Sequence, residues 1–94
     1  MQGSSRAPTR EVGVALPETV DLHARPAAAF VRTAMRYSSS VWITVDERQA
    51  DAKSLLSVLA LGVKRGTTLC LRAEGEDAAA ALDALAETIT ALRD

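Results

Sequence analysis

The spacing of hydrophobic residues changes repeatedly along this chain, and that succession limits the fold more than any other feature. In four short segments every second residue is apolar, as in a strand that buries one face. In three other segments apolar residues recur every three or four positions, as on one side of a helix. The succession predicts strand, helix, strand, strand, helix, strand, helix.

The four predicted strands are short and are separated by turn or loop residues. Val12, Val14 and Leu16 alternate with small residues from Glu11 onward, and Pro17 ends that strand. The other three segments are 41–45, 48–52 and 69–72. A turn at Asp46 and Glu47 is expected to make the second and third strands antiparallel neighbours.

Three amphipathic helices are predicted. The first spans 24–37, with Pro26 near its start and an apolar face formed by Ala27, Phe30, Val31, Ala34 and Met35. The second begins at Ser54 and ends before Gly62. The third begins at Glu76, where Glu76 and Asp77 in the first turn and Arg93 at the end would complement the helix dipole.

One apolar face per element favours an α+β fold in two layers. We expect an open-faced β-sandwich, a four-stranded antiparallel sheet (βαββαβα) covered on one face by three helices. Residues 1–10 are expected to be a flexible tail and residues 11–94 a single domain. Trp42 and Cys70 fall on the open face of the sheet, where a cross-strand packing pair is the simplest interpretation.

Composition excludes several functional classes. Lys and Arg number 11 against 12 Asp and Glu, so the net charge of −1 disfavours binding to nucleic acid. One cysteine, Cys70, and one histidine, His23, are too few for a disulfide or a structural zinc site, and no other metal or cofactor motif is recognisable. The chain has no long apolar run and no signal-like start. We therefore expect a cytoplasmic location and no membrane insertion.

The segment LHARPAA, residues 22–28, carries the most chemistry. Its histidine stands where the first helix begins, at unpaired backbone N–H groups and the positive end of the helix dipole, which together favour an anion. A neutral imidazole could attack phosphorus there, and Arg25 could bind phosphoryl oxygens. The alternative is that His23 is only a cap or a surface residue.

Three motifs resemble those of HPr, the histidine phosphocarrier family of the phosphoenolpyruvate-dependent sugar phosphotransferase system: LHARPAA, KSLL at 53–56 and EGEDA at 74–78. The resemblance implies a carrier of phosphoryl groups rather than an enzyme, working without a cofactor. It implies that His23 accepts phosphorus on Nδ1 from phosphorylated enzyme I and passes it to enzyme IIA, with Arg25 assisting. A monomer is expected.

The resemblance implies two further sites. In some family lineages an HPr kinase phosphorylates the serine that matches Ser54, and the product joins a transcriptional regulator; an ordinary helix N-cap is the alternative for this residue. The first two helices would dock partner proteins, through Ala24, Arg32, Leu55, Leu56 and Leu59. The leucines could instead belong to the core, and Arg32 could be a solvated charge.

The chain departs from the family pattern just before the histidine motif. Asp21 stands where relatives usually have glycine, and Val20 where Asn or Ser is frequent. Aspartate tolerates positive φ better than most residues, so the loop could keep its path. Two rival functions stay open: a regulatory binding module controlled by Ser54, and a carrier in a non-sugar relay of nitrogen or dihydroxyacetone type.

Overall fold

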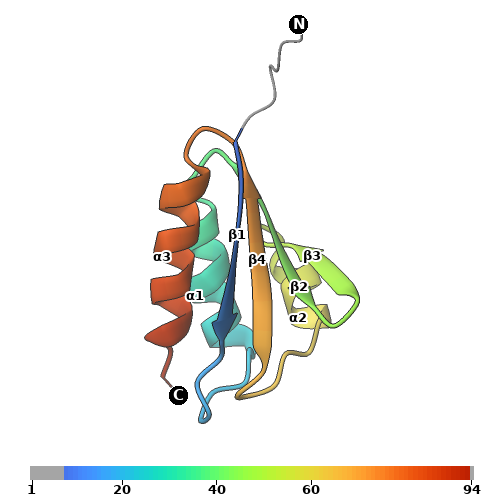
Figure 1. Ribbon diagram of the computed structural model, residues 1–94. Coiled ribbons are helices and arrows are strands. Elements are labelled where there is room, and N and C mark those ends of the chain that lie inside the picture. Colours follow the sequence, from blue (N-terminus) through green and yellow to red (C-terminus); the bar gives the residue numbers. More distant parts are fainter. Residues whose placement is uncertain (1–7, 94) are drawn as a thin grey trace, which may run out of the picture.

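The computed structural model describes residues 8–93 and has the predicted order of elements (Figure 1). The elements are β1 Thr9–Ala15, α1 Ala24–Ala34, β2 Ser40–Val45, β3 Arg48–Asp51, α2 Leu55–Ala60, β4 Thr68–Glu74 and α3 Ala78–Thr90. The predicted tail, residues 1–10, lies outside the described residues over its first seven positions, and its last two belong to β1.

The four strands form one antiparallel sheet in the order β1-β4-β2-β3. Leu71 in β4 pairs with Val12 of β1 on one side and with Ile43 of β2 on the other, and Ile43 in turn pairs with Ala50 of β3. This row of apolar residues crosses the whole sheet on one face. The period-2 pattern therefore predicted the buried faces of the strands, while the structure adds their order and register.

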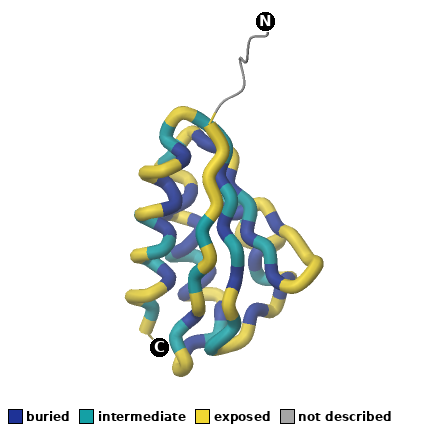
Figure 2. The backbone as a smooth tube through the Cα atoms, viewed as in Figure 1, coloured by how far each residue is buried: buried dark blue, intermediate teal, exposed yellow. Residues whose placement is uncertain are grey.

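All three helices cover the same face of the sheet, so the predicted two-layer α+β fold is confirmed. Helix α3 lies along β1 and β4, α1 packs beside α3, and α2 lies under β3 and beside α1 (Figure 1). The buried residues follow the inner faces of these elements, whereas the outer surfaces of the helices are exposed (Figure 2). Phe30, Ile43, Leu71 and Leu85 are fully buried between the two layers.

Strand β1 begins two residues earlier than predicted. Thr9 pairs with Glu74 and Arg10 with Ala73, and the N–H of Gly75 donates to the carbonyl of Pro8 at 2.9 Å. Thr9 and Arg10 are both exposed. Backbone pairing with β4, rather than a hydrophobic pattern, extends the strand here, and this is why the sequence pattern missed it.

Helix α1 ends at Ala34 rather than at residue 37, and Met35 is wrong as a member of its apolar face, since it is 64% exposed. The chain after the helix is held from another element. The carboxylate of Asp77 accepts hydrogen bonds from the N–H groups of Ser38 (2.8 Å) and Ser39 (2.9 Å) and from both hydroxyls. Hydrogen bonding with Ser39 and Ser38 lowers the pKa of Asp77 to about 2.

The start of α3 was also predicted wrongly. The helix begins at Ala78, so that Glu76 and Asp77 precede its first turn, which contains no acidic residue. Asp77 occupies the N-cap position, yet its side chain bonds to the serines after α1 and makes no capping hydrogen bond. The carboxylate therefore links two loops and does not complement the dipole of α3 through a capping bond.

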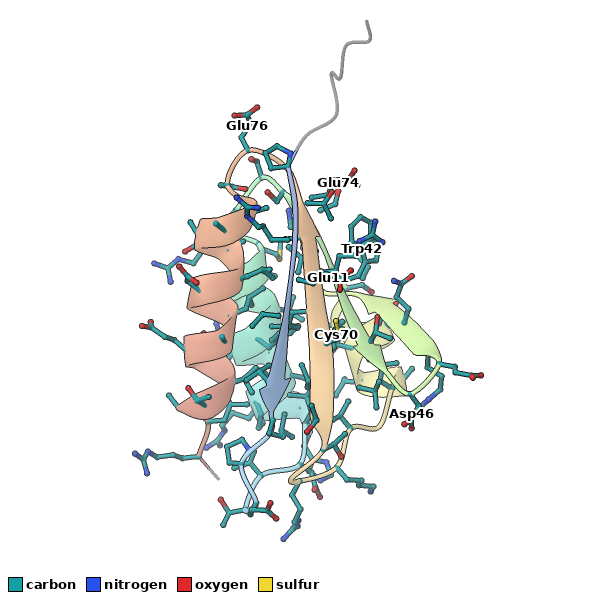
Figure 3. All side chains as sticks on the ribbon, viewed as in Figure 1. Glu11, Trp42, Asp46, Cys70, Glu74 and Glu76 are labelled. Carbon is teal, nitrogen blue, oxygen red and sulfur yellow. The ribbon has the colours of Figure 1, made fainter. Side chains whose placement is uncertain are left out.

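The open face of the sheet has a different packing pair from the one predicted. Trp42 lies opposite Arg72, whose guanidinium carbon is 5.3 Å from the centroid of the indole ring, a cation–π contact. Cys70 lies opposite Gly13 and Thr44 instead. Figure 3 labels both Trp42 and Cys70 on the sheet. The cross-strand interpretation of Trp42 was right, but its partner is an arginine on β4.

Candidate functional site

The loop between β1 and α1 presents the single histidine at the start of α1. Three backbone hydrogen bonds hold it there: Leu22 N–H to Val63 C=O (2.9 Å), His23 N–H to Asp21 C=O (2.9 Å) and Ala27 N–H to His23 C=O (2.8 Å). His23 is the N-cap residue with extended backbone, but its side chain makes no capping hydrogen bond. The imidazole is 75% exposed. A fixed backbone therefore carries a ring that solvent and partners can reach.

The first turn of α1 offers donors for an anion beside this ring. The amides of Ala24 and Arg25 belong to the first turn, where N–H groups have no intrahelical acceptor. Pro26 follows, and as a proline it has no N–H to leave unpaired. Arg25 is exposed, so its guanidinium can turn toward an anion bound at the helix start. The local sequence thus places two amides and one cation within one helical turn of His23.

Asp21 contacts the histidine from the other side. Its Oδ2 lies 3.4 Å from His23 Nε2. Its Oδ1 accepts hydrogen bonds from Arg65 N–H (2.7 Å) and Arg65 Nε (3.2 Å). These bonds, the side-chain bond first, lower the pKa of Asp21 to about 2. No local pattern predicts the pair with Arg65, because that residue is 44 positions away along the chain.

The backbone of this loop does not need the glycine that relatives usually carry. Asp46 is the only non-glycine residue with positive φ among residues 8–93, so Val20 and Asp21 both lie in ordinary regions. Val20 is buried, with 1% of its surface exposed. Valine and aspartate are therefore accommodated here without left-handed backbone.

A hollow of about 230 Å³ opens beside His23. Its walls come from the histidine loop, from α2 and from the segment after α2: Asp21, Leu22, His23, Leu59, Gly62, Val63 and Lys64. Gly62, with φ of +61°, turns the chain at the end of α2 as predicted. The structure thus brings one of the predicted docking leucines, Leu59, to the same surface as the histidine.

The remaining predicted docking residues, Leu55, Leu56, Ala24 and Arg32, are all exposed but do not line this hollow. Leu56 is 79% exposed and Leu55 is 38% exposed, whereas Val58 of the same helix is fully buried. Ala24 is exposed beside His23. Arg32 is exposed too, but it lines a separate hollow of about 500 Å³ on the second half of α1, together with Ala29, Thr33, Met35 and Arg36. The structure does not bring Arg32 into the hollow beside His23.

Ser54 is the N-cap residue of α2. Its Oγ accepts a hydrogen bond from the N–H of Ser57 at 3.3 Å and donates to the Ser57 hydroxyl at 3.0 Å. The preceding Lys53 donates through Nζ to the carbonyl of Tyr37 at 2.7 Å, which links the start of α2 to the end of α1. Ser54 thus has the structural role of a helix cap.

Two negative observations apply to the described part of the chain. Within residues 8–93, no group of three His, Cys, Asp or Glu side chains is arranged to hold a metal ion. No helix in that range combines the length and the hydrophobicity needed to cross a membrane.

The chain is similar to known proteins over most of its length. The model of the family PTS-HPr, "PTS HPr component phosphorylation site", matches residues 9–91. The phosphocarrier protein HPr of Mycoplasma capricolum is 36% identical over 74 residues, which cover 79% of this chain and 83% of that protein. The HPr-like protein Crh of Bacillus subtilis is 45% identical over 65 residues, covering 69% and 76%.

A solved structure extends the likeness to three dimensions. The crystal structure of a phosphocarrier protein HPr from Bacillus anthracis has a TM-score of 0.83 and 33% identity, and the match covers 87% of this chain and 98% of that one. The fold and the length of the match agree with those of the family. This chain belongs to the HPr family of phosphocarrier proteins of the phosphotransferase system, which are carriers and not enzymes.

Proposed function

We propose that His23 is the phosphoryl acceptor of this chain, taking the group on Nδ1 from phosphorylated enzyme I and passing it to enzyme IIA of a sugar phosphotransferase system. One observation carries the proposal: the only imidazole in the chain stands at the N-cap of α1, is 75% exposed and is not engaged in capping. A donor histidine on another protein can therefore approach it directly.

The transfer forms one P–N bond and breaks another. The lone pair on Nδ1 of His23 attacks the phosphorus, and the bonding pair of the donor's P–N bond returns to the donor imidazole. The amides of Ala24 and Arg25 and the Arg25 guanidinium would bind the equatorial oxygens, where negative charge is concentrated in the transition state. Reversal of the same step delivers the group to enzyme IIA.

The docking surface supports two large partners in turn. Leu55, Leu56 and Leu59 lie on α2, and Leu59 lines the hollow that holds His23. Exposed leucines beside the reactive ring are suited to bury against a protein surface. We assign Ala24 to the same contact, and Arg32 to its margin on α1. A monomer in the cytoplasm meets the needs of such a shuttle.

The test is phosphorylation by enzyme I and phosphoenolpyruvate, followed by intact mass measurement before and after acid treatment. We expect the wild-type chain to gain one acid-labile phosphoryl group. His23→Ala should gain none, whereas Ser54→Ala, a matched change at another candidate site, should be phosphorylated like the wild type. An unchanged mass for the wild-type chain would overturn the proposal.

A regulatory role of Ser54 is the second candidate, and its position favours it in one respect. The hydroxyl caps α2 directly before Leu55 and Leu56, so a phosphoryl group there would put charge next to the docking leucines and oppose burial. An HPr kinase and a transcriptional regulator would then be further partners. Incubation with HPr kinase that leaves Ser54 unmodified would remove this candidate. A relay of nitrogen or dihydroxyacetone type would show as preferential phosphorylation by the enzyme I of that branch.

A further inference from the structure

We propose that Asp21, held by Arg65, is a positioning residue for His23: its carboxylate keeps the proton of the neutral imidazole on Nε2 and so leaves the lone pair on Nδ1. The inference rests on the proposed function of His23 and adds a residue to it.

The geometry makes Asp21 the fixed member of the pair. Its side chain is only 14% exposed, and Arg65 binds it through three contacts: N–H and Nε to Oδ1, and Nη2 to Oδ2 at 3.4 Å. The backbone bond from His23 N–H to Asp21 C=O draws the two residues together. The exposed ring of His23 therefore meets a carboxylate that is already held in place.

The chemistry of a carboxylate decides which ring nitrogen is protonated. With a pKa of about 2, Asp21 is ionised near neutral pH and can only accept hydrogen bonds. A lone pair on Nε2 would repel Oδ2, whereas an N–H there is attracted to it. The distance of 3.4 Å is longer than an ideal hydrogen bond, and such contacts commonly shorten when the reacting partner binds.

The same contact supports the transfer step. When the lone pair of Nδ1 forms a bond to phosphorus, the ring gains positive charge, while the Nε2 proton stays in place facing Asp21. The donor's P–N bond breaks and its electron pair returns to the donor. Arg65 and Lys64 are the cations that face Asp21, and they offset its charge toward the incoming phosphoryl group.

The direct test is the tautomer of the neutral His23 ring, measured from the ¹⁵N and ¹H signals of the full chain at a pH where the ring is uncharged. Wild type should show a protonated Nε2 and a bare Nδ1. Asp21→Asn keeps an oxygen for the Arg65 N–H but removes the charge, and its amide can donate to Nε2, so the Nδ1–H form should increase. Asp46→Asn, a matched change at an exposed turn residue, should leave the tautomer as in wild type.

Two outcomes would overturn the inference: a wild-type ring protonated on Nδ1, or the same tautomer ratio in wild type and in Asp21→Asn. Should Asp21→Asn not fold, Asp21→Gly supplies the same comparison with the residue usual in relatives. The rate of phosphoryl transfer from enzyme I should fall about three- to tenfold in either variant, since the carboxylate that faces Nε2 and fixes the tautomer is lost.

The design separates this inference from the proposed function. If His23 is never phosphorylated but the tautomer shifts in Asp21→Asn, the positioning contact stands and the acceptor assignment fails. If His23 is phosphorylated at equal rates and with equal tautomers in all three proteins, the acceptor assignment stands and the role of Asp21 is refuted.

Discussion

Replacement of Leu56 by alanine should weaken docking without weakening the fold. Leu56 is 79% exposed, so little of its hydrophobic stabilisation has been gained on folding and most is available to a partner. Complete burial of a leucine side chain is worth about 1.5 to 3 kcal/mol, and four-fifths of that is roughly 1 to 2.5 kcal/mol. The dissociation constant for enzyme I should therefore rise about 5- to 50-fold.

Val58 on the same helix provides the matched control, because it is fully buried. Val58→Ala should lower the free energy of unfolding by about 2 kcal/mol, whereas Leu56→Ala should change it by less than about 0.5 kcal/mol. Urea titrations measure the free energy of unfolding, and calorimetric titration with enzyme I measures the dissociation constant. Equal binding by Leu56→Ala and wild type would show that this leucine lies outside the interface, and the docking surface would have to be redrawn.

Three further predictions concern the fold and the transfer step. Gly75 has φ of +151°, and a Cβ there would lie 2.8 Å from Ser39 Cα, so Gly75→Ala should cost about 1 to 3 kcal/mol in a urea titration. Gly62→Ala, where φ is +61° but the space around the Cβ is open, should lower the free energy of unfolding by about 1 kcal/mol. Equal losses of stability in the Gly75→Ala and Gly62→Ala variants would contradict the steric reasoning. The pKa of Asp77 is lowered on folding, so its stabilisation is present above about pH 4 and lost as pH falls toward 2. The difference in unfolding free energy between wild type and Asp77→Asn should shrink over that range, and a constant difference would show that the carboxylate charge is irrelevant. Arg25→Ala should slow phosphoryl transfer about 100-fold in rapid-quench measurements. Arg25→Lys should recover only part of the rate, since lysine lacks the planar guanidinium that binds two oxygens at once. Full recovery of the rate by lysine would show that only the positive charge of Arg25 matters.

The sequence predicted the parts of the fold that depend on local hydrophobic spacing. The alternation of Val41, Ile43 and Val45 identified β2 and its buried face, and the spacing of Leu82, Leu85 and Ile89 identified the buried side of α3. In both cases apolar residues repeated at one period are enough to predict the element, because burial of one apolar face is the dominant favourable contribution to folding.

The ends of elements were predicted less well because contacts between distant segments decide them. Met35 continues the helical pattern of α1, yet the helix stops at Ala34, and Asp77 binds the backbone of Ser38 and Ser39 just beyond. Those bonds join residues 39 and 38 positions apart, which no window of local spacing can contain. For the same reason the candidate site was predicted as His23 with Arg25, and the contact of Asp21 with Arg65 was not.

The site combines a rigid backbone with an exposed reactive ring, and a carrier needs both. A ring buried in a closed active site could be reached by a small substrate but not by the phosphohistidine of another protein. Conversely, an exposed ring on a mobile loop would have to be ordered at every encounter, at a cost in conformational entropy. Here the bonds from Leu22 to Val63 and from Ala27 to His23 order the backbone in advance, while 75% of the imidazole surface stays open. Two partners can thus bind the same preformed helix start in turn, and any change that loosens it should impair acceptance and donation of phosphorus alike.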